Sequence, residues 1–163
     1  MHFCGYTKQT SSSFGSESAL NRRASEFNPA KEDLLRGPVE ELFPATRFFV
    51  KREVPFGLKR IDLVFKERTN GRNMIAVELK VRNWKRAIWQ AVQNCQIAAY
   101  SYVALPTSAV SPVDISMLGV LGLGLIVTDE RKAKIVFPAK RSQYINKRMA
   151  NVIADLVESS SDV

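Results

Sequence analysis

The sequence contains very little histidine or cysteine, and this shortage excludes several catalytic classes. Among 163 residues there is one histidine, His2, and there are two cysteines, Cys4 and Cys95. A single histidine in an N-terminal segment argues against Ser-His-Asp and Cys-His catalysis, and against zinc sites with several histidine ligands. Two cysteines form neither a four-thiolate metal site nor a disulfide framework. Any catalysis must therefore use carboxylates, lysine, tyrosine, serine or a metal ion bound by oxygen atoms.

Long apolar segments are also scarce. The most apolar run, residues 117–127, is about half the length of a membrane-spanning helix and contains three glycines. Residues 1–20 lack the basic-then-apolar order of a secretory signal. We therefore expect no membrane association and a reducing, cytoplasmic setting.

Positive charge is abundant. The chain has 24 Lys and Arg against 16 Asp and Glu, a net charge of +8. Residues 47–100 alone hold 12 basic and four acidic residues, which equals the excess of the whole chain. Such a balance favours an anionic partner, with nucleic acid first and a membrane surface second. Of the two nucleic acids we expect DNA, with RNA as the alternative, and we expect no membrane.

The periodicity of apolar residues predicts one α/β domain over residues 29–157. The flanking segments 1–28 and 158–163 are polar, and we expect a disordered tail and a frayed end there. Helices are predicted at 29–44, 84–99, 112–121 and 142–157, and strands at 46–54, 59–66, 73–81, 100–105, 123–128 and 134–139. Gly37-Pro38 should kink or divide the first helix, and Asn70-Gly71 should form a hairpin tip. The resulting order predicts a mixed central sheet flanked by helices.

Three charged residues fall inside two of the predicted strands. Glu78 and Lys80 are two positions apart, so they should share a strand face, and Asp62 lies on the neighbouring strand of the predicted hairpin. Asp62 has the opposite parity from the apolar set of its strand, so it can face Glu78 and Lys80. Buried charges are costly unless they are paired or bind a metal, which makes this cluster a candidate site. A structural salt bridge is the alternative explanation of the same pattern.

With these residues in place, the sequence resembles the PD-(D/E)xK nuclease superfamily, which has the restriction-endonuclease-like fold. The resemblance covers residues 31–105, extends to about 138, and implies an α-β-β-β-α-β core followed by a C-terminal strand pair and helix. It implies that Asp62, Glu78 and the main-chain carbonyl of Leu79 hold Mg²⁺ or Mn²⁺, and that Lys80 positions or polarises the attacking water. Ile61 stands where the family name has proline.

The resemblance also implies a helical glutamate and a helical glutamine near the metal. Glu32 is favoured over Glu40 and Glu41, because it shares a helix side with the apolar residues of the first helix. Gln90 on the second helix is favoured over Gln96, because it lies nearer the expected active-site end. A solvated side chain remains the alternative for each of these residues.

A basic and aromatic run follows the motif and offers contacts to nucleic acid. Trp84 could stack on a base or sugar, or could anchor the core, since it shares the apolar stripe of its helix. Trp89 lies off that stripe and is a candidate for an exposed contact or a dimer surface. The candidate nucleic-acid-binding residues are Arg60, Arg82, Trp84, Lys85 and Arg86.

The sequence therefore predicts a Mg²⁺-dependent or Mn²⁺-dependent nuclease that hydrolyses DNA. The alternatives are a catalytically weak or inactive nucleic-acid-binding module of the same fold, and a basic protein that associates with RNA or an assembly. The presence of Asp62, Glu78 and Lys80 together favours the nuclease. Substrate form, endonucleolytic or exonucleolytic cleavage, pathway and a homodimer all stay open.

Overall fold

A computed structural model describes residues 29–69, 73–129 and 131–159 of the chain. The expected tail at 1–28, the Asn70-Gly71 hairpin tip and residues 160–163 of the expected frayed end lie outside these ranges. Within the described residues, no helix combines the length and the apolar character that a membrane span requires.

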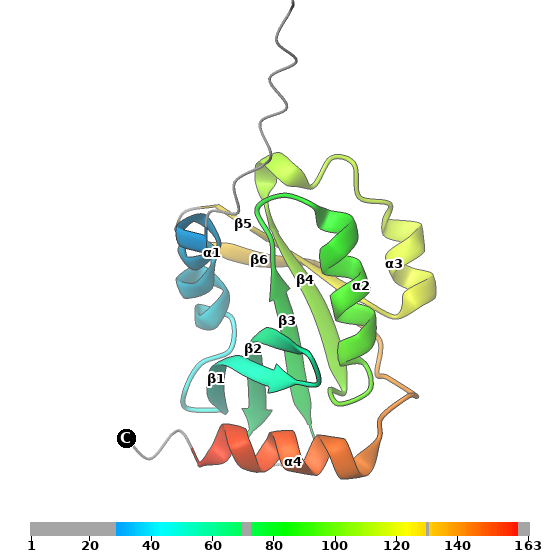
Figure 1. Ribbon diagram of the computed structural model, residues 1–163. Helices are drawn as coiled ribbons and strands as arrows, with labels where there is room; N and C mark the ends of the chain where they lie inside the picture. The colour runs from blue at the N-terminus through cyan, green and yellow to red at the C-terminus, as the bar shows by residue number, and fades with distance from the viewer. Residues whose placement is uncertain (1–28, 70–72, 130, 160–163) are drawn as a thin grey trace, which may run out of the picture.

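The described chain forms one six-stranded mixed sheet with helices on its faces (Figure 1). The strands follow the chain in the order β1-β2-β3-β4-β5-β6; β3, β4 and β5 are parallel, and the other neighbouring pairs are antiparallel. This confirms the predicted α/β class with a mixed central sheet. The helices are α1 (Pro29–Glu41), α2 (Trp84–Asn94), η1 (Thr107–Ala109), α3 (Ile115–Leu121) and α4 (Lys147–Glu158). The strands are β1 (Phe48–Phe56), β2 (Lys59–Glu67), β3 (Met74–Leu79), β4 (Tyr100–Pro106), β5 (Gly124–Thr128) and β6 (Ala133–Phe137).

The two faces of the sheet bury different sets of side chains. Helix α1 packs Leu35 and Val39 against one face, where Phe65 and Val77 lie. Helices α2 and α4 cover the other face, in two further apolar clusters. Strands β2 and β3 are therefore buried on both faces, which places any polar side chain on them in an apolar setting.

Helix α1 runs through Pro38 without ending, so the expected division into two helices does not occur. Proline removes the hydrogen bond to the carbonyl four residues earlier, which belongs to Leu34. Leu34 is on the exposed side of the helix, where water can replace the lost donor. The helix ends at Glu41, shortly before Pro44.

The observed helices are shorter than the apolar pattern indicated, most of all at the end of α2 and the start of α4. Helix α2 ends at Asn94, where the N–H groups of Cys95, Gln96 and Ile97 donate to carbonyls three residues earlier in place of the four-residue spacing of an α-helix. Helix α4 starts at Lys147, because the side chain of Asn146 caps it by accepting from the Met149 N–H. The chain just before α4 is tied to residues 95–99 by backbone and hydroxyl hydrogen bonds, which helix formation from 142 would break.

Gly124 on β5 provides a test of this packing. A Cβ added there would lie 2.3 Å from the ring of Tyr102 and 2.8 Å from the main-chain nitrogen of Ala139. Gly124→Ala should therefore lower the free energy of unfolding by about 1–3 kcal/mol, measured by urea denaturation. The matched change Gly119→Ala, in α3, meets only the Phe137 ring at 3.4 Å and should raise the free energy of unfolding by about 0.5–1 kcal/mol. Equal urea midpoints for wild type and Gly124→Ala would contradict this packing.

Candidate active site

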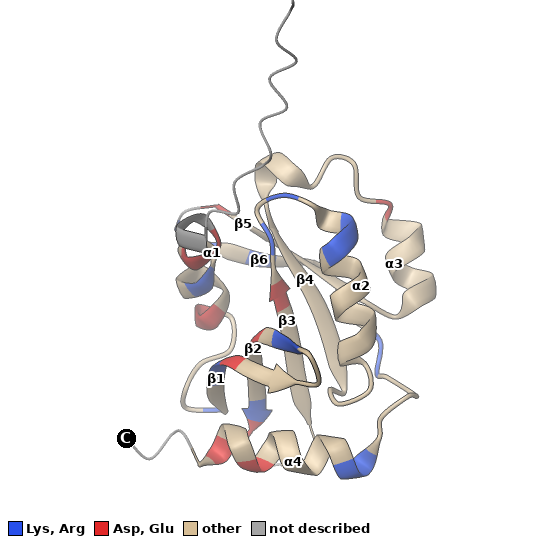
Figure 2. Cartoon of the chain, viewed as in Figure 1, with Lys and Arg blue, Asp and Glu red and all other residues tan. Residues whose placement is uncertain are grey.

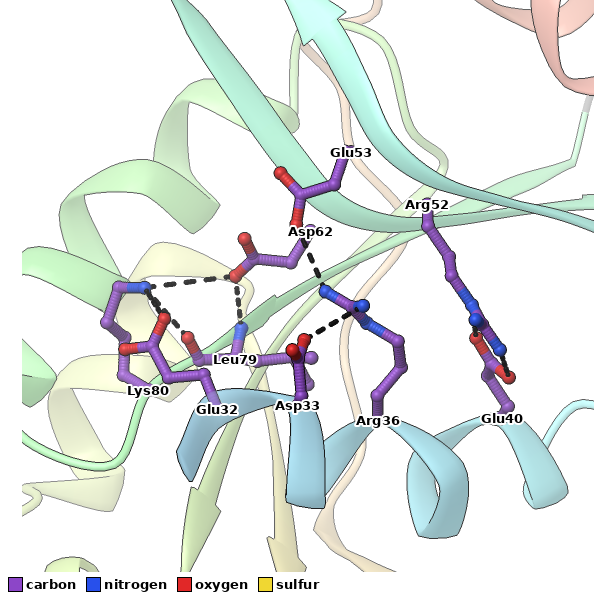
Figure 3. Close-up of polar contacts among 9 residues, drawn as sticks. All are labelled: Glu32, Asp33, Arg36, Glu40, Arg52, Glu53, Asp62, Leu79 and Lys80. Atoms are coloured by element: carbon purple, nitrogen blue, oxygen red, sulfur yellow. Dashed lines mark hydrogen bonds and ion pairs between the residues drawn. The ribbon is translucent and has the colours of Figure 1, made fainter. Parts of the chain in front are cut away.

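Asp62 is fixed beside the end of β3 by a main-chain donor. Strands β2 and β3 pair from Leu63 opposite Val77 to Lys66 opposite Met74. Just beyond that pairing, the Leu79 N–H donates a hydrogen bond of 2.7 Å to Asp62 Oδ2. The aspartate side chain thus takes the place that a strand partner would occupy, and it brings a carboxylate to the end of β3 (Figure 3).

Lys80 connects this carboxylate to helix α1. Its Nζ donates to Glu32 Oε2 at 2.8 Å and to the Leu79 carbonyl at 2.9 Å, and it lies 4.0 Å from Asp62 Oδ2 (Figure 3). The Lys80 side chain is 12% exposed, so its charge is largely removed from solvent. Of the three helix glutamates considered, Glu32 is the one that contacts Lys80, whereas Glu40 binds Arg52 at 2.7 Å and Glu41 is exposed.

Glu78 is buried on the side of β3 that faces α2. Its side chain is 0% exposed, and Oε1 accepts a hydrogen bond of 2.7 Å from Asn94 Nδ2. Lys59 Nζ lies 3.8 Å from the same oxygen. The other oxygen, Oε2, accepts no hydrogen bond from any residue that the structure describes.

Glu78 and Lys80 were expected to share one face of β3, but their side chains contact different helices. Strand β3 ends at Leu79, two residues earlier than predicted, so Lys80 is free of the strict alternation of a strand. Lys80 reaches Glu32 of α1, whereas Glu78 reaches Asn94 of α2. The charges of Asp62 and Lys80 nevertheless both act on the pKa of Glu78, Asp62 raising it and Lys80 lowering it.

Burial dominates the protonation of this cluster. Burial is the largest of the causes that raise the pKa of Glu78 to about 7, and the negative charge of Asp62 acts in the same direction. The Asn94 hydrogen bond and the charges of Lys59 and Lys80 act in the opposite direction. Burial also raises the pKa of Asp62, against the Leu79 N–H and Lys80. The pKa of Lys59 is lowered by burial, although Glu78 and Asp62 oppose the change. The ion pairs within the cluster therefore offset only part of the cost of burying its charges.

Lys59 and Asn94 are site residues that the sequence did not reveal. Lys59 begins β2, where a lysine resembles any solvated strand end. Asn94 is 0% exposed and lies on the buried stripe of α2 with Ala87 and Ala91. The sequence did contain one indication of Asn94, namely an amide within an otherwise apolar helix stripe. A buried amide requires hydrogen-bond partners, so it indicates a polar neighbour.

Gln90 lies at the border of the cluster. Its main-chain carbonyl accepts a hydrogen bond of 2.9 Å from Lys59 Nζ. Its side-chain oxygen is buried and, within the described part of the chain, has no hydrogen-bond partner. Gln96, the alternative glutamine, has an exposed side chain, and its carbonyl accepts from the Asn146 N–H.

The predicted nucleic-acid contacts divide into exposed cations and a packed aromatic. Basic residues colour the loop after β3 and the start of α2 in Figure 2. Trp84 is half-buried against the cluster under α2, with Lys85 Nζ 5.6 Å from its ring, so the core role predominates. Trp89 is 63% exposed, as its position off the stripe predicted. The exposed cations are Arg60, Arg82, Lys85 and Arg86.

Ion pairs hold α1 over the sheet and thereby place Glu32. Arg36 pairs with Glu53 of β1 at 3.1 Å, and Arg52 of β1 makes two hydrogen bonds of 2.7 Å to Glu40 (Figure 3). Glu53 has a left-handed backbone with φ of 50°, which is uncommon for a residue other than glycine. Its charge contributes to raising the pKa of Asp62.

The oxygen atoms of the cluster suit a hard cation such as Mg²⁺ or Mn²⁺ better than a softer metal such as Zn²⁺. No group of three or more His, Cys, Asp or Glu side chains spaced to hold a metal occurs among the described residues. Two carboxylates and a carbonyl are present instead, from Asp62, Glu78 and Leu79, and Glu78 Oε2 is the buried oxygen without a partner in the described chain. Mg²⁺ is commonly bound through one or two carboxylates while it keeps several waters, so this donor set fits it.

Comparisons with known proteins establish the fold and do not reach function. No protein-family model and no curated protein matches the chain. The solved structure of a protein of unknown function from Silicibacter pomeroyi is similar, with a TM-score of 0.60 and 19% sequence identity. The match covers 83% of this chain and 87% of that chain. At this identity the likeness shows a shared fold alone.

The raised pKa of Glu78 predicts a pH-dependent stability. Between pH 4.5, the ordinary value, and about 7, the unfolded chain releases the Glu78 proton while the folded chain keeps it. Stability due to Glu78 is therefore lost as the pH rises through this window. Urea denaturation with a chelator present should show wild type losing about 3 kcal/mol relative to Glu78→Gln from pH 4.5 to 7. A stability difference that stays constant with pH would contradict the burial of this carboxyl.

Proposed function

We propose that the protein is a metal-dependent nuclease of the PD-(D/E)xK type that hydrolyses DNA phosphodiester bonds. The observation that carries the proposal is the position of three charged groups at the end of β3. Asp62 is held by the Leu79 N–H, Lys80 lies 4.0 Å from Asp62, and Glu78 is 0% exposed next to them. Charge held inside an apolar sheet at this cost is typical of a functional site.

The proposed reaction needs neutralisation of the charge that grows on the phosphoryl oxygens. Asp62, Glu78 and the Leu79 carbonyl would hold the metal, and a bound Mg²⁺ or Mn²⁺ supplies Lewis-acid stabilisation of that charge. The unpartnered Oε2 of Glu78 among the described residues supports this assignment.

Lys80 is suited to act on the developing charge directly. An ammonium group has three N–H donors, and Glu32 and the Leu79 carbonyl take two of them. The distance of 4.0 Å to Asp62 is too long for a hydrogen bond, so the third N–H can donate to a phosphoryl oxygen or the attacking water. Glu32 keeps the ammonium in place, because it ties Lys80 to α1.

Exposed cations beside the site support a nucleic-acid substrate. Arg82, Lys85 and Arg86 lie at the entry to α2, directly after the strand that carries Glu78. Exposed arginine and lysine neutralise phosphates and release counterions, which gives affinity independent of sequence. We assign these three residues, with Arg60, to DNA phosphate contacts.

A nucleic-acid-binding module without useful catalysis is the second candidate. The observation that favours it is the internal pairing of the charged groups, since Lys80 already binds Glu32 and Glu78 already binds Asn94. In that case the ion pairs would be structural, and substitutions would change stability without changing any cleavage.

The first test of the proposed function is cleavage of plasmid DNA with Mg²⁺ or Mn²⁺. Wild type should cut, and Lys80→Met should cut at least about 100-fold more slowly, because the charge facing the reacting phosphate is lost. Asp62→Asn should be similarly impaired. DNA affinity, measured in a chelator, should stay within about twofold in both variants. The matched control is Lys134→Met, which changes an exposed lysine on β6 and should cut normally. Wild-type rates in Lys80→Met and Asp62→Asn would refute the catalytic assignment.

The second test measures DNA affinity as a function of salt. Replacing Arg82, Lys85 and Arg86 together by alanine should reduce the slope of log affinity against log salt by about 2–3, since each phosphate contact contributes about 0.9. The control replaces three exposed cations near and on β6, namely Arg131, Lys132 and Lys134. Equal slopes for the two triple variants would contradict an interface at the entry to α2.

A further inference from the structure

A buried amide at the last position of α2 lies between an acid and an ammonium group. Asn94 is 0% exposed; its Nδ2 donates to Glu78 Oε1 at 2.7 Å, and its Oδ1 accepts from Lys59 Nζ at 2.7 Å. An ammonium group only donates hydrogen bonds, and a carboxylate only accepts them. One orientation of the amide satisfies both neighbours, so Lys59 determines that the N–H groups of Asn94 face Glu78.

Lys59 is itself held in place by helix α2. Its Nζ donates a second hydrogen bond of 2.9 Å to the Gln90 carbonyl, in the last turns of the helix, where carbonyl groups carry partial negative charge. The ammonium also lies 5.6 Å from the centre of the Phe56 ring. Both contacts stabilise the Lys59 ammonium group at the end of α2.

The amide also separates the two charges. Lys59 Nζ is 3.8 Å from Glu78 Oε1, which is beyond hydrogen-bonding distance. A buried pair that served only stability would gain more from a direct charge-assisted hydrogen bond. Here Asn94 takes Oε1, Lys59 remains one amide away, and Oε2 is left without a donor from the described residues.

We infer that Asn94 is a positioning residue for Glu78, and that Lys59 fixes the orientation of the Asn94 amide. Together they hold the Glu78 carboxylate in one orientation, with Oε1 occupied and Oε2 available to a cation. Outer hydrogen bonds that orient a ligand typically contribute about 10-fold to 100-fold in metal affinity. This inference rests on the proposed function, because it concerns the same carboxylate.

The first experiment measures metal affinity without requiring catalysis. Asn94→Leu keeps the branching and the number of heavy atoms of the asparagine side chain but removes both hydrogen bonds. Calorimetric titration of the full chain with Mn²⁺ should show at least about 10-fold weaker binding than wild type, while DNA affinity in a chelator stays within about twofold. The control is Asn151→Leu, which changes an exposed asparagine of α4 and should bind Mn²⁺ as wild type does. Wild-type Mn²⁺ affinity in Asn94→Leu would overturn the inference and leave the proposed function standing.

The second experiment needs no metal. A double-mutant cycle combines Asn94→Leu with Glu78→Met, which removes both acceptor oxygens, and follows urea unfolding in a chelator. Side chains that share a buried hydrogen bond should be coupled by at least about 10-fold in the unfolding equilibrium constant, and coupling below about twofold would overturn the inference. If wild type binds no Mn²⁺, the proposed function fails and this cycle alone decides whether Asn94 holds Glu78.

The part assigned to Lys59 has its own measurement. In Lys59→Met, the side-chain amide protons of Asn94 should exchange with solvent at least about 10-fold faster by NMR, because Asn94 Oδ1 loses its donor and only the hydrogen bond to Glu78 still holds the amide. An unchanged exchange rate would overturn the role of Lys59.

Discussion

A carboxylate with no exposed surface lies within the apolar centre of the sheet, and the positions of several elements follow from the need to stabilise it. Asn94, the last residue of α2, donates a hydrogen bond to Glu78. Lys59, the first residue of β2, places a positive charge 3.8 Å from the same carboxylate oxygen. Removing either element would leave an unpaired buried charge, which is far more costly than an exposed one. The end of α2 and the start of β2 are thus parts of one electrostatic arrangement around β3.

The second arrangement belongs to α1. Its apolar residues pack on the sheet, but the helix also makes ion pairs with β1 and with Lys80. Exposed ion pairs contribute little to stability individually. Their contribution here is geometric, since together they set the position of α1 along the sheet and therefore the position of Glu32 next to Lys80.

Local pattern predicted most of the fold and named part of the charged cluster at the end of β3. Alternation and apolar runs located all six strands, and helical phase distinguished Glu32 from Glu40 and Glu41. The end of α2 was wrong because local turns follow Asn94, and the start of α4 was wrong because hydrogen bonds tie the residues before it to residues 95–99, which are distant in sequence. Lys59 and Asn94 were missed because they are 35 residues apart, and their shared role exists only after β2 and α2 pack together. Whether the cluster binds a metal or cleaves DNA stays a prediction.

The hydrogen bonds made by Asp62 and by Lys80 close chain loops of different length. The hydrogen bond between Asp62 and Leu79 spans 17 residues, whereas the one between Lys80 and Glu32 spans 48. Closing the longer loop costs about 1 kcal/mol more in chain entropy. A chain in which α1 has not yet docked can therefore already hold Asp62 against β3, while Lys80 still lacks Glu32. The cluster thus consists of a short-range half built by a hairpin and a long-range half that depends on one helix.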